Sequence, residues 1–465
     1  MGRLRRGGMI DIRCRIFVII AFILTWPCET FARDVYVRLS NSGSYSIGIT
    51  DGMRTMTDAE GRLANLGDSA EITANNGYAV IMGNAFPMPV RISGAGFLQF
   101  KGRTYRGAFL ITQRAGLMNV IDVEEYLYGV LPAEVGADWH KEALRTQAIC
   151  ARTYVLKQSM KRAEKGFDVV DTDADQVYKG VGVETAKTNQ AVASTAGEVL
   201  TYGKELAITY FHSDSGGHTA DITDVWGSDY PYLKGVPEIV NYKSPVSSWN
   251  AKISSQRIRN AVQKVTGTDI GEISEVQVSE VDDGGRAVTM TFIGANGTKS
   301  MKASQFRTAA GPRELKSTML TPSGGAFRVE NQTTPSGIVA QRNSQPSGNE
   351  LTFEEEQGIA KMASEGVFTT TELVDMLTNL DKRKKYYQIG ISRTGRKAEA
   401  PAKNPRKKYG YSVEKSGDDF IFYGRGWGHG VGMSQWGAMA MAKEGYTAEK
   451  ILAHYYPGTT VRKIK

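Results

Sequence analysis

The sequence predicts an α+β protein that is rich in β-structure, with a few packed helices and an inserted segment. In residues 34–119, short apolar runs are broken about every ten residues by Gly, Asn or Pro, which is typical of many short strands. A helix is expected next, from an N-cap at Asp138 to Met160, because apolar residues recur there at helical spacing. The run Asp282-Asp283-Gly284-Gly285 lies between two strand-like stretches and predicts a hairpin.

The start of the 465-residue chain has the layout of a secretory signal peptide. Several arginines precede the apolar residues 16–26, and small residues follow before Arg33. The apolar run is short for a membrane span, although an uncleaved anchor is the alternative. We therefore expect residues 1–32 to be a signal peptide and the protein to be exported, to the periplasm or the cell wall.

Composition divides the remaining chain into a domain with an insertion. Residues 33–320 would form the first part of the domain and residues 411–465 its C-terminal part. Residues 321–410 would be the insertion, which begins with a disordered linker rich in Ser, Pro, Gly, Asn and Gln. Two capping-box patterns, Thr352-x-x-Glu355 and Thr369-x-x-Glu372, predict a helical hairpin after the linker.

The net charge of +8 comes from one segment. Residues 381–408 contain eleven Lys and Arg against two acidic residues, a local charge of +9. An exported chain would not meet nucleic acid, so we expect none as a partner. The segment is expected either to bind an anionic wall polymer or membrane surface, or to be a solvated linker.

Cysteine usage excludes an internal disulfide in the mature chain. Of the three cysteines, Cys14 and Cys28 fall within the predicted signal peptide, which leaves Cys150. Cys150 lies on an apolar helical stripe, so we expect a buried small hydrophobe rather than a nucleophile.

One glutamate stands where a general acid would be expected. Glu134 follows an apolar stretch, interpreted as a strand, and Pro132, just before the predicted helix. Apolar neighbours at such a strand-to-helix corner would raise the pKa of its carboxyl. A lone glutamate is more often a surface group, and position alone leaves both readings open.

A second unusual stretch, GRGWGHGVGMSQWGA, covers residues 424–438. If it is extended, Gly426, Gly428, Gly430 and Gly432 share one bare face, which invites a ligand to lie flat against the backbone. The alternative is that the glycines let the chain pass tightly under the closing helices.

Four motifs resemble the SpoIID/LytB family in the family's order. They are the run over residues 126–154, the stretch Asp175-Gln176-Val177-Tyr178-Lys179-Gly180, the segment around His212, and the glycine-rich stretch leading to His454-Tyr455-Tyr456-Pro457-Gly458. The resemblance implies a lytic transglycosylase that acts on peptidoglycan glycan strands stripped of stem peptides, with Glu134 as its catalytic residue. LytB-type members imply the alternative, a non-catalytic enhancer of a wall amidase. A third reading is an adhesion or scaffold module that uses the basic insert.

A single carboxyl is enough for a transglycosylase, because the C6 hydroxyl of N-acetylmuramic acid is the nucleophile and no cofactor is required. Hydrolysis stays open because Asp138 and Glu142 are close in sequence, although helix-start positions favour capping roles for them. The residues expected to bind substrate are Gln147, Arg152, Tyr154, His212, Trp427, His429, Ser434 and Gln435.

Zinc is a further possibility that the resemblance raises. Some family members hold zinc with a histidine and two cysteines in the part of the chain that contains His212. Here the cysteines are absent, and His218 and Asp224 stand at equal spacing after His212. Imidazole and carboxylate both ligate zinc, so the three residues are a candidate site, with structural or glycan-contacting histidines as the alternative.

Overall fold

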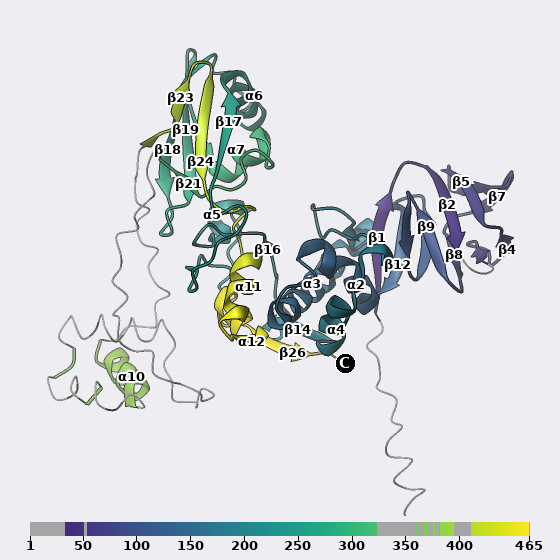
Figure 1. Ribbon diagram of the computed structural model, residues 1–465, viewed down its shortest axis with the longest axis horizontal. Coiled ribbons are helices and arrows are strands. Elements are labelled where there is room, and N and C mark those ends of the chain that lie inside the picture. The colour runs from purple at the N-terminus through teal and green to yellow at the C-terminus, as the bar shows by residue number, and fades with distance from the viewer. Residues whose placement is uncertain are drawn as a thin grey trace, which may run out of the picture.

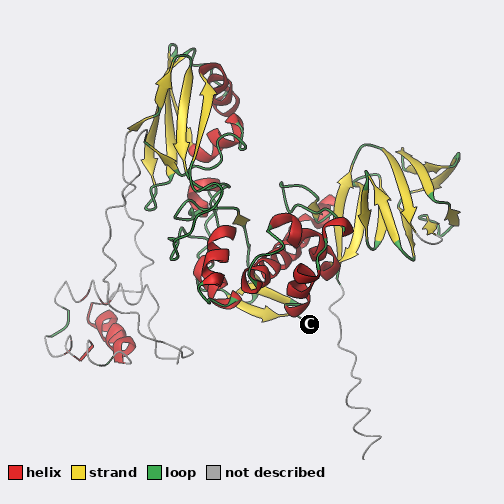
Figure 2. Cartoon of the chain, in the orientation of Figure 1, coloured by secondary structure: helices red, strands yellow, loops and turns green. Residues whose placement is uncertain are grey.

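The computed structural model describes residues 33–50, 54–322 and 411–464. Within residues 323–410 it describes 359, 362, 367–369, 372, 375, 376, 379 and 382–394. The predicted signal peptide, most of the predicted linker and the first capping box lie outside the described residues. Helices and strands in several sheets confirm the α+β class (Figure 2). Within the described ranges, every helix is too short or too polar to cross a lipid bilayer.

The β-rich region predicted for residues 34–119 is confirmed and forms one end of the molecule (Figure 1). Its strands are β1 (Asp34–Ser40), β2 (Ser44–Thr50), β3 (Arg54–Thr57), β4 (Leu63–Leu66), β5 (Ser69–Asn75), β6 (Tyr78–Ile81), β7 (Asn84–Pro87), β8 (Val90–Gly94), β9 (Phe97–Phe100), β10 (Arg103–Tyr105), β11 (Ala108–Thr112) and β12 (Gly116–Asp122). One sheet has the order β13-β1-β12-β11-β8-β3-β4, where β13 is Val169–Val170, and the other has the order β10-β9-β2-β5-β6-β7. Alternating residues such as Val35 and Val37 point into the core between them.

Helices fill the middle of the molecule. They are α2 (Val123–Glu134), α3 (Lys141–Arg162), α4 (Ala186–Ser194), α5 (Ile222–Trp226), α11 (Gln435–Lys443) and α12 (Ala448–Tyr455). A small sheet of β15 (Glu205–Leu206), β14 (Glu198–Tyr202) and β26 (Thr460–Lys463) lies beside them. The central helix α3 packs on α2 and α4 and on the C-terminal helices α11 and α12. Segments far apart in sequence therefore meet on α3.

A second β-sheet region forms the other end of the molecule (Figure 1). Its strands and helices are β17 (Trp249–Ser254), α6 (Ser255–Thr266), β18 (Ile273–Val281), β19 (Ala287–Gly294), β20 (Gly297–Lys302), α7 (Ala303–Ala310), β21 (Leu320–Thr321), β22 (Tyr411–Ser412), β23 (Glu414–Ser416) and β24 (Asp419–Gly424). The predicted hairpin joins β18 to β19, as expected. The chain enters this region through β17 and leaves it through β24, which pairs antiparallel with β17. It then continues into α11.

The partly described segment contains α10 (Arg383–Thr394), which falls within the basic residues 381–408. The second predicted capping box is confirmed there. Glu372 Oε2 accepts from the backbone N–H of Thr369, and Thr369 Oγ1 accepts from the N–H of Glu372. Arg393 on α10 forms an ion pair with Glu372 at 2.8 Å.

Two local predictions near Glu134 are wrong. The apolar stretch before Pro132 is helix α2 and not a strand, because the Asp122 carboxylate caps the helix by accepting from the N–H groups of Glu124 and Glu125. Glu134 is the last residue of that helix. The N-cap of α3 is His140, whose Nδ1 accepts from the Glu142 N–H, and not Asp138.

Candidate active site

Glu134 ends α2 with its carboxyl partly buried and held in place. The backbone N–H of Val177 donates to Oε1 at 2.7 Å. Burial raises the pKa of the carboxyl above its ordinary value, and the hydrogen bond from Val177 and the nearby Gln435 side chain lower it by smaller amounts. None of the ion pairs found among the described residues includes Glu134. The carboxyl therefore has the raised pKa expected from the sequence, although a helix end rather than a strand carries it.

The loop that carries Val177 is fastened to α3. Asp175 Oδ1 accepts from the Tyr154 hydroxyl at 2.9 Å, and Asp175 Oδ2 accepts from Arg162 at 2.6 Å. The next residue, Gln176, is fully buried and donates to the Ala151 carbonyl. Tyr154, expected to bind substrate, thus has its hydroxyl engaged in positioning the loop that contacts Glu134.

Aromatic rings continue from Tyr154 across the site. The ring of Tyr154 lies 6.1 Å from that of Tyr210, and Tyr210 lies 6.2 Å from His429. His429 in turn lies 5.5 Å from His212. Trp226 contacts both Tyr210, at 4.8 Å, and His429, at 4.9 Å. Sequence reasoning missed Tyr210 and Trp226, although an aromatic pair so close to His212 and Asp224 in sequence was a usable signal.

This series of side-chain contacts continues from His212 through the C-terminal segment back to Glu134. Strand β16 (Phe211–His212) pairs in parallel with β25 (Met433–Ser434), which places His212 opposite Ser434. The next residue, Gln435, begins α11 and lies near the Glu134 carboxyl. We call this set the site ring; its members are Glu134, Tyr154, Asp175, Val177, Tyr210, His212, His429, Ser434 and Gln435.

Within the described part of the chain, three side chains in or beside the site ring have buried polar atoms without hydrogen-bond partners. Gln147 is 1 % exposed, yet neither its Oε1 nor its Nε2 has a hydrogen-bond partner among the described residues. Gln147 lies on the stripe of α3 that contains Cys150 and Tyr154, the stripe that faces β25 and Tyr210. His212 Nε2 is likewise buried without a partner, and Gln435 Nε2 makes no hydrogen bond of ordinary geometry, although it lies close enough to Glu134 to lower the pKa of that carboxyl. Buried polar groups are normally paired, so these three side chains mark a place where a ligand would supply the missing bonds.

Both histidines of the site ring are neutral. Burial lowers the pKa of His212 well below its ordinary value and lowers that of His429 to about 3. A carbonyl oxygen only accepts, so His212 Nδ1 carries the proton that it donates to the Val431 carbonyl at 3.2 Å. His212 Nε2 is therefore a free acceptor. His429 has the other tautomer, because its Nδ1 accepts from the Val431 N–H at 3.0 Å.

The extended conformation expected for the glycine-rich stretch is wrong. Gly426, Gly428, Gly430 and Gly432 all have positive φ, between 72° and 125°. A Cβ on Gly432 would lie 2.0 Å from the Tyr210 carbonyl oxygen, and one on Gly428 would lie 2.6 Å from the His212 Cβ. These glycines let the backbone pass closely against residues 210–216, so they serve packing as the alternative held, although most of the nearest atoms belong to that segment rather than to the closing helices.

Two further residues of that stretch lie differently from expectation. Ser434 is fully buried and caps α11, since its Oγ accepts from the Gly437 N–H. Trp427 is 41 % exposed, but the side chain that lies over its ring is Lys316, whose Nζ is 5.8 Å from the ring centre. Its backbone pairs with Asp214. Trp427 is therefore exposed to solvent without a ring contact to the site ring among the described residues.

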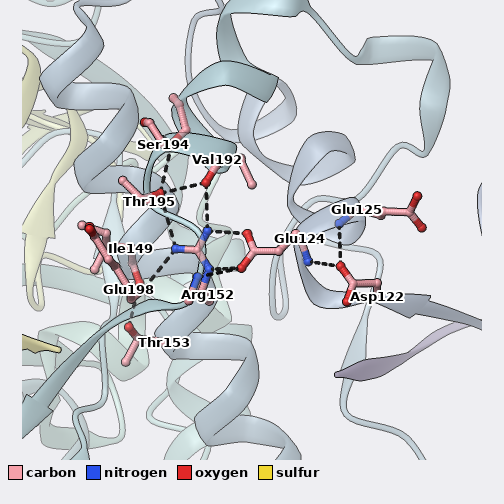
Figure 3. A network of polar contacts seen from close by, with 12 residues as sticks. Asp122, Glu124, Glu125, Ile149, Arg152, Thr153, Val192, Ser194, Thr195 and Glu198 are labelled. Carbon is pink, nitrogen blue, oxygen red and sulfur yellow. Dashed lines mark hydrogen bonds and ion pairs between the residues drawn. The ribbon is translucent and has the colours of Figure 1, made fainter. Parts of the chain in front are cut away.

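Arg152, expected to bind substrate, is instead engaged in a structural network (Figure 3). Its guanidinium is fully buried and donates to both oxygens of Glu124, at 2.8 and 2.5 Å. The remaining donors reach the Thr195 hydroxyl and the carbonyls of Glu198 and Val192. All five N–H donors are used, so none is left for a ligand.

The candidate zinc residues do not fit a metal site. Among the residues that the structure describes, no group of three or more His, Cys, Asp or Glu side chains could hold an ion. His212 Nδ1 and His218 Nδ1 both face backbone carbonyls, of Val431 and Thr219. Zinc-binding histidines often make such contacts through their second nitrogen, so it is the missing ligand group among the described residues that favours structural or ligand-contacting histidines over a zinc set with Asp224.

A hollow of about 400 Å³ lies away from this site, on β2 and β9, and is lined by Ser46, Gln99 and Lys101 among other residues. Glu134 does not line it. The site ring is thus a partly exposed face of the helical region, assembled from α2, α3, the 175–177 loop and the C-terminal segment.

Comparison with known proteins gives this region a family. Residues 112–202, which contain Glu134, Gln147 and Tyr154, match the family model SpoIID, described as Stage II sporulation protein. Over this stretch the chain is similar to the SpoIID family. The match confirms the resemblance seen in the motifs.

Two relatives are similar to the chain over much of its length, and a third over a shorter stretch. The amidase enhancer of Bacillus subtilis (strain 168) is 28 % identical over 335 residues, which cover 72 % of this chain and 40 % of that protein. Stage II sporulation protein D of the same organism is 28 % identical over 356 residues, which cover 73 % and 74 %. The protein of that name from Bacillus amyloliquefaciens is 37 % identical over 140 residues, which cover 27 % and 41 %. The chain thus spans less than half the length of the amidase enhancer.

Proposed function

We propose that this protein is an exported lytic transglycosylase that acts on peptidoglycan. It would cut glycan strands stripped of stem peptides, between N-acetylmuramic acid and N-acetylglucosamine. The observation that carries the proposal is the state of Glu134. Its carboxyl is held by one backbone N–H, its pKa is raised by burial, and no cation pairs with it among the described residues. A carboxyl in this state keeps its proton to a higher pH than an exposed glutamate does, as a general acid requires.

Glu134 would serve first as acid and then as base. The Val177 N–H occupies Oε1, which leaves Oε2 to carry the proton. That proton passes to the glycosidic oxygen as the bond from C1 of N-acetylmuramic acid to this oxygen breaks. The resulting carboxylate accepts the proton of the C6 hydroxyl of the same sugar as that oxygen bonds to C1. The products are a 1,6-anhydro end and a free hydroxyl on the departing sugar, and Glu134 is protonated again.

The carboxylates close to Glu134 bear on the choice between this route and hydrolysis. Glu142 Oε2 accepts both from Arg145 at 3.0 Å and from the Ala448 N–H at 3.0 Å, so this oxygen serves packing of the helices. Asp138 is exposed, and its carbonyl accepts from Lys187. Asp173 is exposed and raises the pKa of Glu134 through its charge. A hydrolase needs a second carboxyl that activates water or attacks the sugar. Glu142, whose carboxylate is tied through Oε2 to Arg145 and to the start of α12, is a poor candidate for that task.

A second candidate function has its own support. A relative that matches 72 % of this chain is named an amidase enhancer. In that case the site ring would bind glycan without cutting it, and the partner would be a wall amidase. The unpartnered polar atoms of Gln147, His212 and Gln435 are compatible with either function, because both require sugar binding.

Glu134→Gln separates the two functions. The amide keeps the shape of the carboxyl and can still accept from Val177, but it cannot donate and recover a proton. Purified wild-type protein and the variant are incubated with glycan strands with and without stem peptides, and the products are identified by mass spectrometry. A transglycosylase gives anhydro-ended products that fall by about 10²- to 10⁴-fold in the variant.

The matched control is Glu125→Gln, on the same helix but in its first turn. Glu125 lies 3.9 Å from Arg106, so we expect this variant to retain activity. Anhydro products made equally well by Glu134→Gln would overturn the proposal. Stimulation of a wall amidase by both wild type and Glu134→Gln, without anhydro products, would establish the enhancer instead.

A further inference from the structure

Trp226 is a large apolar side chain left exposed beside the site ring. Its side chain is at the end of α5, and the residue is 47 % exposed. The backbone around it is held firmly. Asp221 caps α5 by accepting from the Thr223 N–H, and Gly227 closes the helix in the left-handed conformation at φ 82°. The Val225 carbonyl accepts from Ser304 at 3.0 Å, which ties α5 to α7.

The indole of Trp226 is also fixed by other rings. It lies 4.8 Å from Tyr210 and 4.9 Å from His429, at interplanar angles of 59° and 51°. Both neighbours are members of the site ring, and Tyr210 leads through Tyr154 to the loop that contacts Glu134. The indole is thus held against two members of the site ring, while about half of the residue's surface faces solvent.

We propose that Trp226 is a stacking platform for a pyranose ring of the glycan, at a subsite beside the one that holds the cleaved bond. The inference rests on the proposed function, since it takes a glycan strand as the ligand. A pyranose ring presents C–H groups on its faces, and these pack well on an exposed indole. Because Tyr210 and His429 already hold the indole, little side-chain freedom is lost when the sugar binds.

Exposure alone does not select Trp226, because Trp427 is also 41 % exposed. The two differ in their neighbours. Trp226 contacts two rings of the site ring, whereas the contact of Trp427 is with Lys316. Tyr202 gives a third comparison. It is 41 % exposed and stacks on Tyr232 at 5.1 Å, on the β14 side of the helical region. Tyr202 therefore has the exposure and the ring support of Trp226 without its place beside the site ring.

The test measures binding apart from cleavage. Soluble peptide-free oligosaccharides of alternating N-acetylglucosamine and N-acetylmuramic acid are titrated into the Glu134→Gln protein by calorimetry. The same titration is made with Trp226→Ala, Trp226→Tyr and Tyr202→Ala added to that background. We expect Trp226→Ala to weaken binding about tenfold, Trp226→Tyr to restore most of the affinity, and Tyr202→Ala to leave it unchanged.

A second measurement covers the case in which Trp226→Ala folds poorly. In the full-length Glu134→Gln protein with Trp226 intact, the oligosaccharide should protect tryptophan fluorescence from acrylamide quenching. Trp427→Phe should retain that protection, while Trp226→Phe should lose most of it. Unchanged affinity in Trp226→Ala, or protection that follows Trp427 instead, overturns the platform. A further outcome is that Trp226→Ala loses affinity while the wild-type protein makes no anhydro ends. That result would contradict the transglycosylase activity but support Trp226 as a sugar-binding platform.

Discussion

Two buried polar side chains of helix α3, Arg152 and Gln147, differ in how their hydrogen-bonding groups are satisfied. On one side, Arg152 is fully buried and every donor of its guanidinium has an acceptor (Figure 3). On the other side, Gln147 is equally inaccessible, yet its amide has no partner among the described residues. Five positions along one helix separate a satisfied network from an unsatisfied group. The difference indicates that the Arg152 side maintains the fold, while the Gln147 side is kept open for a ligand.

The largest expected effect is a loss of stability when the buried Arg152 is replaced. Arg152→Ala would leave the Glu124 carboxylate without its buried partner, and it would remove donors from two backbone carbonyls. Breaking one half of a buried ion pair costs about 3–5 kcal/mol of unfolding free energy. Urea unfolding followed by circular dichroism measures the loss.

Lys157→Ala is the control on the same helix. Lys157 lies 3.5 Å from Glu205, whose side chain is 84 % exposed, and exposed pairs contribute about 0–1 kcal/mol. If Arg152→Ala unfolds no more easily than Lys157→Ala, while activity falls, Arg152 belongs to substrate binding as the sequence suggested.

Gln147→Leu is expected to raise the stability of the protein, whereas Arg152→Ala lowers it. The leucine removes an amide that is buried without hydrogen bonds, a situation that costs about 1–3 kcal/mol. The variant should therefore gain stability of that order against urea while its affinity for peptide-free glycan falls. A gain in stability with a loss of function is common where a site is kept strained or unsatisfied for binding.

Gln176→Leu makes this prediction sharp, because Gln176 is just as buried but fully paired. Its Oε1 accepts from the Tyr126 hydroxyl at 3.2 Å, and its Nε2 donates to the Ala151 carbonyl at 3.3 Å. Replacing it leaves the buried Tyr126 hydroxyl without its acceptor, so stability should fall by about 1–3 kcal/mol. If both leucine variants lose stability equally, the open character of the Gln147 side is refuted.

How far the sequence predicted this contrast can be judged from particular residues. Periodicity placed the α3 stripe and the β-rich region correctly, because burial of apolar residues at a fixed period governs both. It failed at residues 126–131, where apolar side chains occur nearly without a break. Such runs suit a buried strand or a buried helix, and the Asp122 cap decided for the helix.

The candidate site was harder to predict than the fold. Glu134, Gln147, His212 and Gln435 were named from motifs, and the structure brings them to one region. Arg152 was named as well, but nothing local in sequence shows that Glu124, Val192 and Glu198 would surround it. Trp226 and Tyr210 were missed because their importance comes from ring contacts across the fold. The glycines were misread because alternation in sequence does not reveal positive φ.

A smaller effect concerns how ionisation of Glu134 changes the folding stability of the protein with pH. Burial raises the pKa of its carboxyl in the folded protein, so the folded state holds this proton to a higher pH than the unfolded chain. Folding stability should therefore fall as pH rises from about 4.3, the ordinary glutamate pKa, through the raised value, and stay reduced above it. Glu134→Gln lacks that ionisation. Its stability relative to wild type should thus increase across this window, and urea midpoints at a series of pH values measure the difference. A difference that is flat with pH would contradict the raised pKa.

The smallest expected effect is that of metal removal. This experiment tells whether a metal ion or a glycan binds the unpaired polar atoms near Gln147. His212 Nε2 is a buried free acceptor, and a zinc ion would satisfy it as well as a sugar hydroxyl would. A zinc ion needs further ligands, and the described residues form no cluster that could supply them. We expect protein purified without a histidine tag to contain no stoichiometric zinc by elemental analysis, and a chelator to leave its unfolding temperature and glycan affinity unchanged. One zinc per chain, with an unfolding temperature that drops on chelation and no longer does so in His212→Ala, would assign the unpaired nitrogen to metal. In that case a metal ion would bind His212, and of the three side chains only Gln147 and Gln435 would remain to bind the glycan.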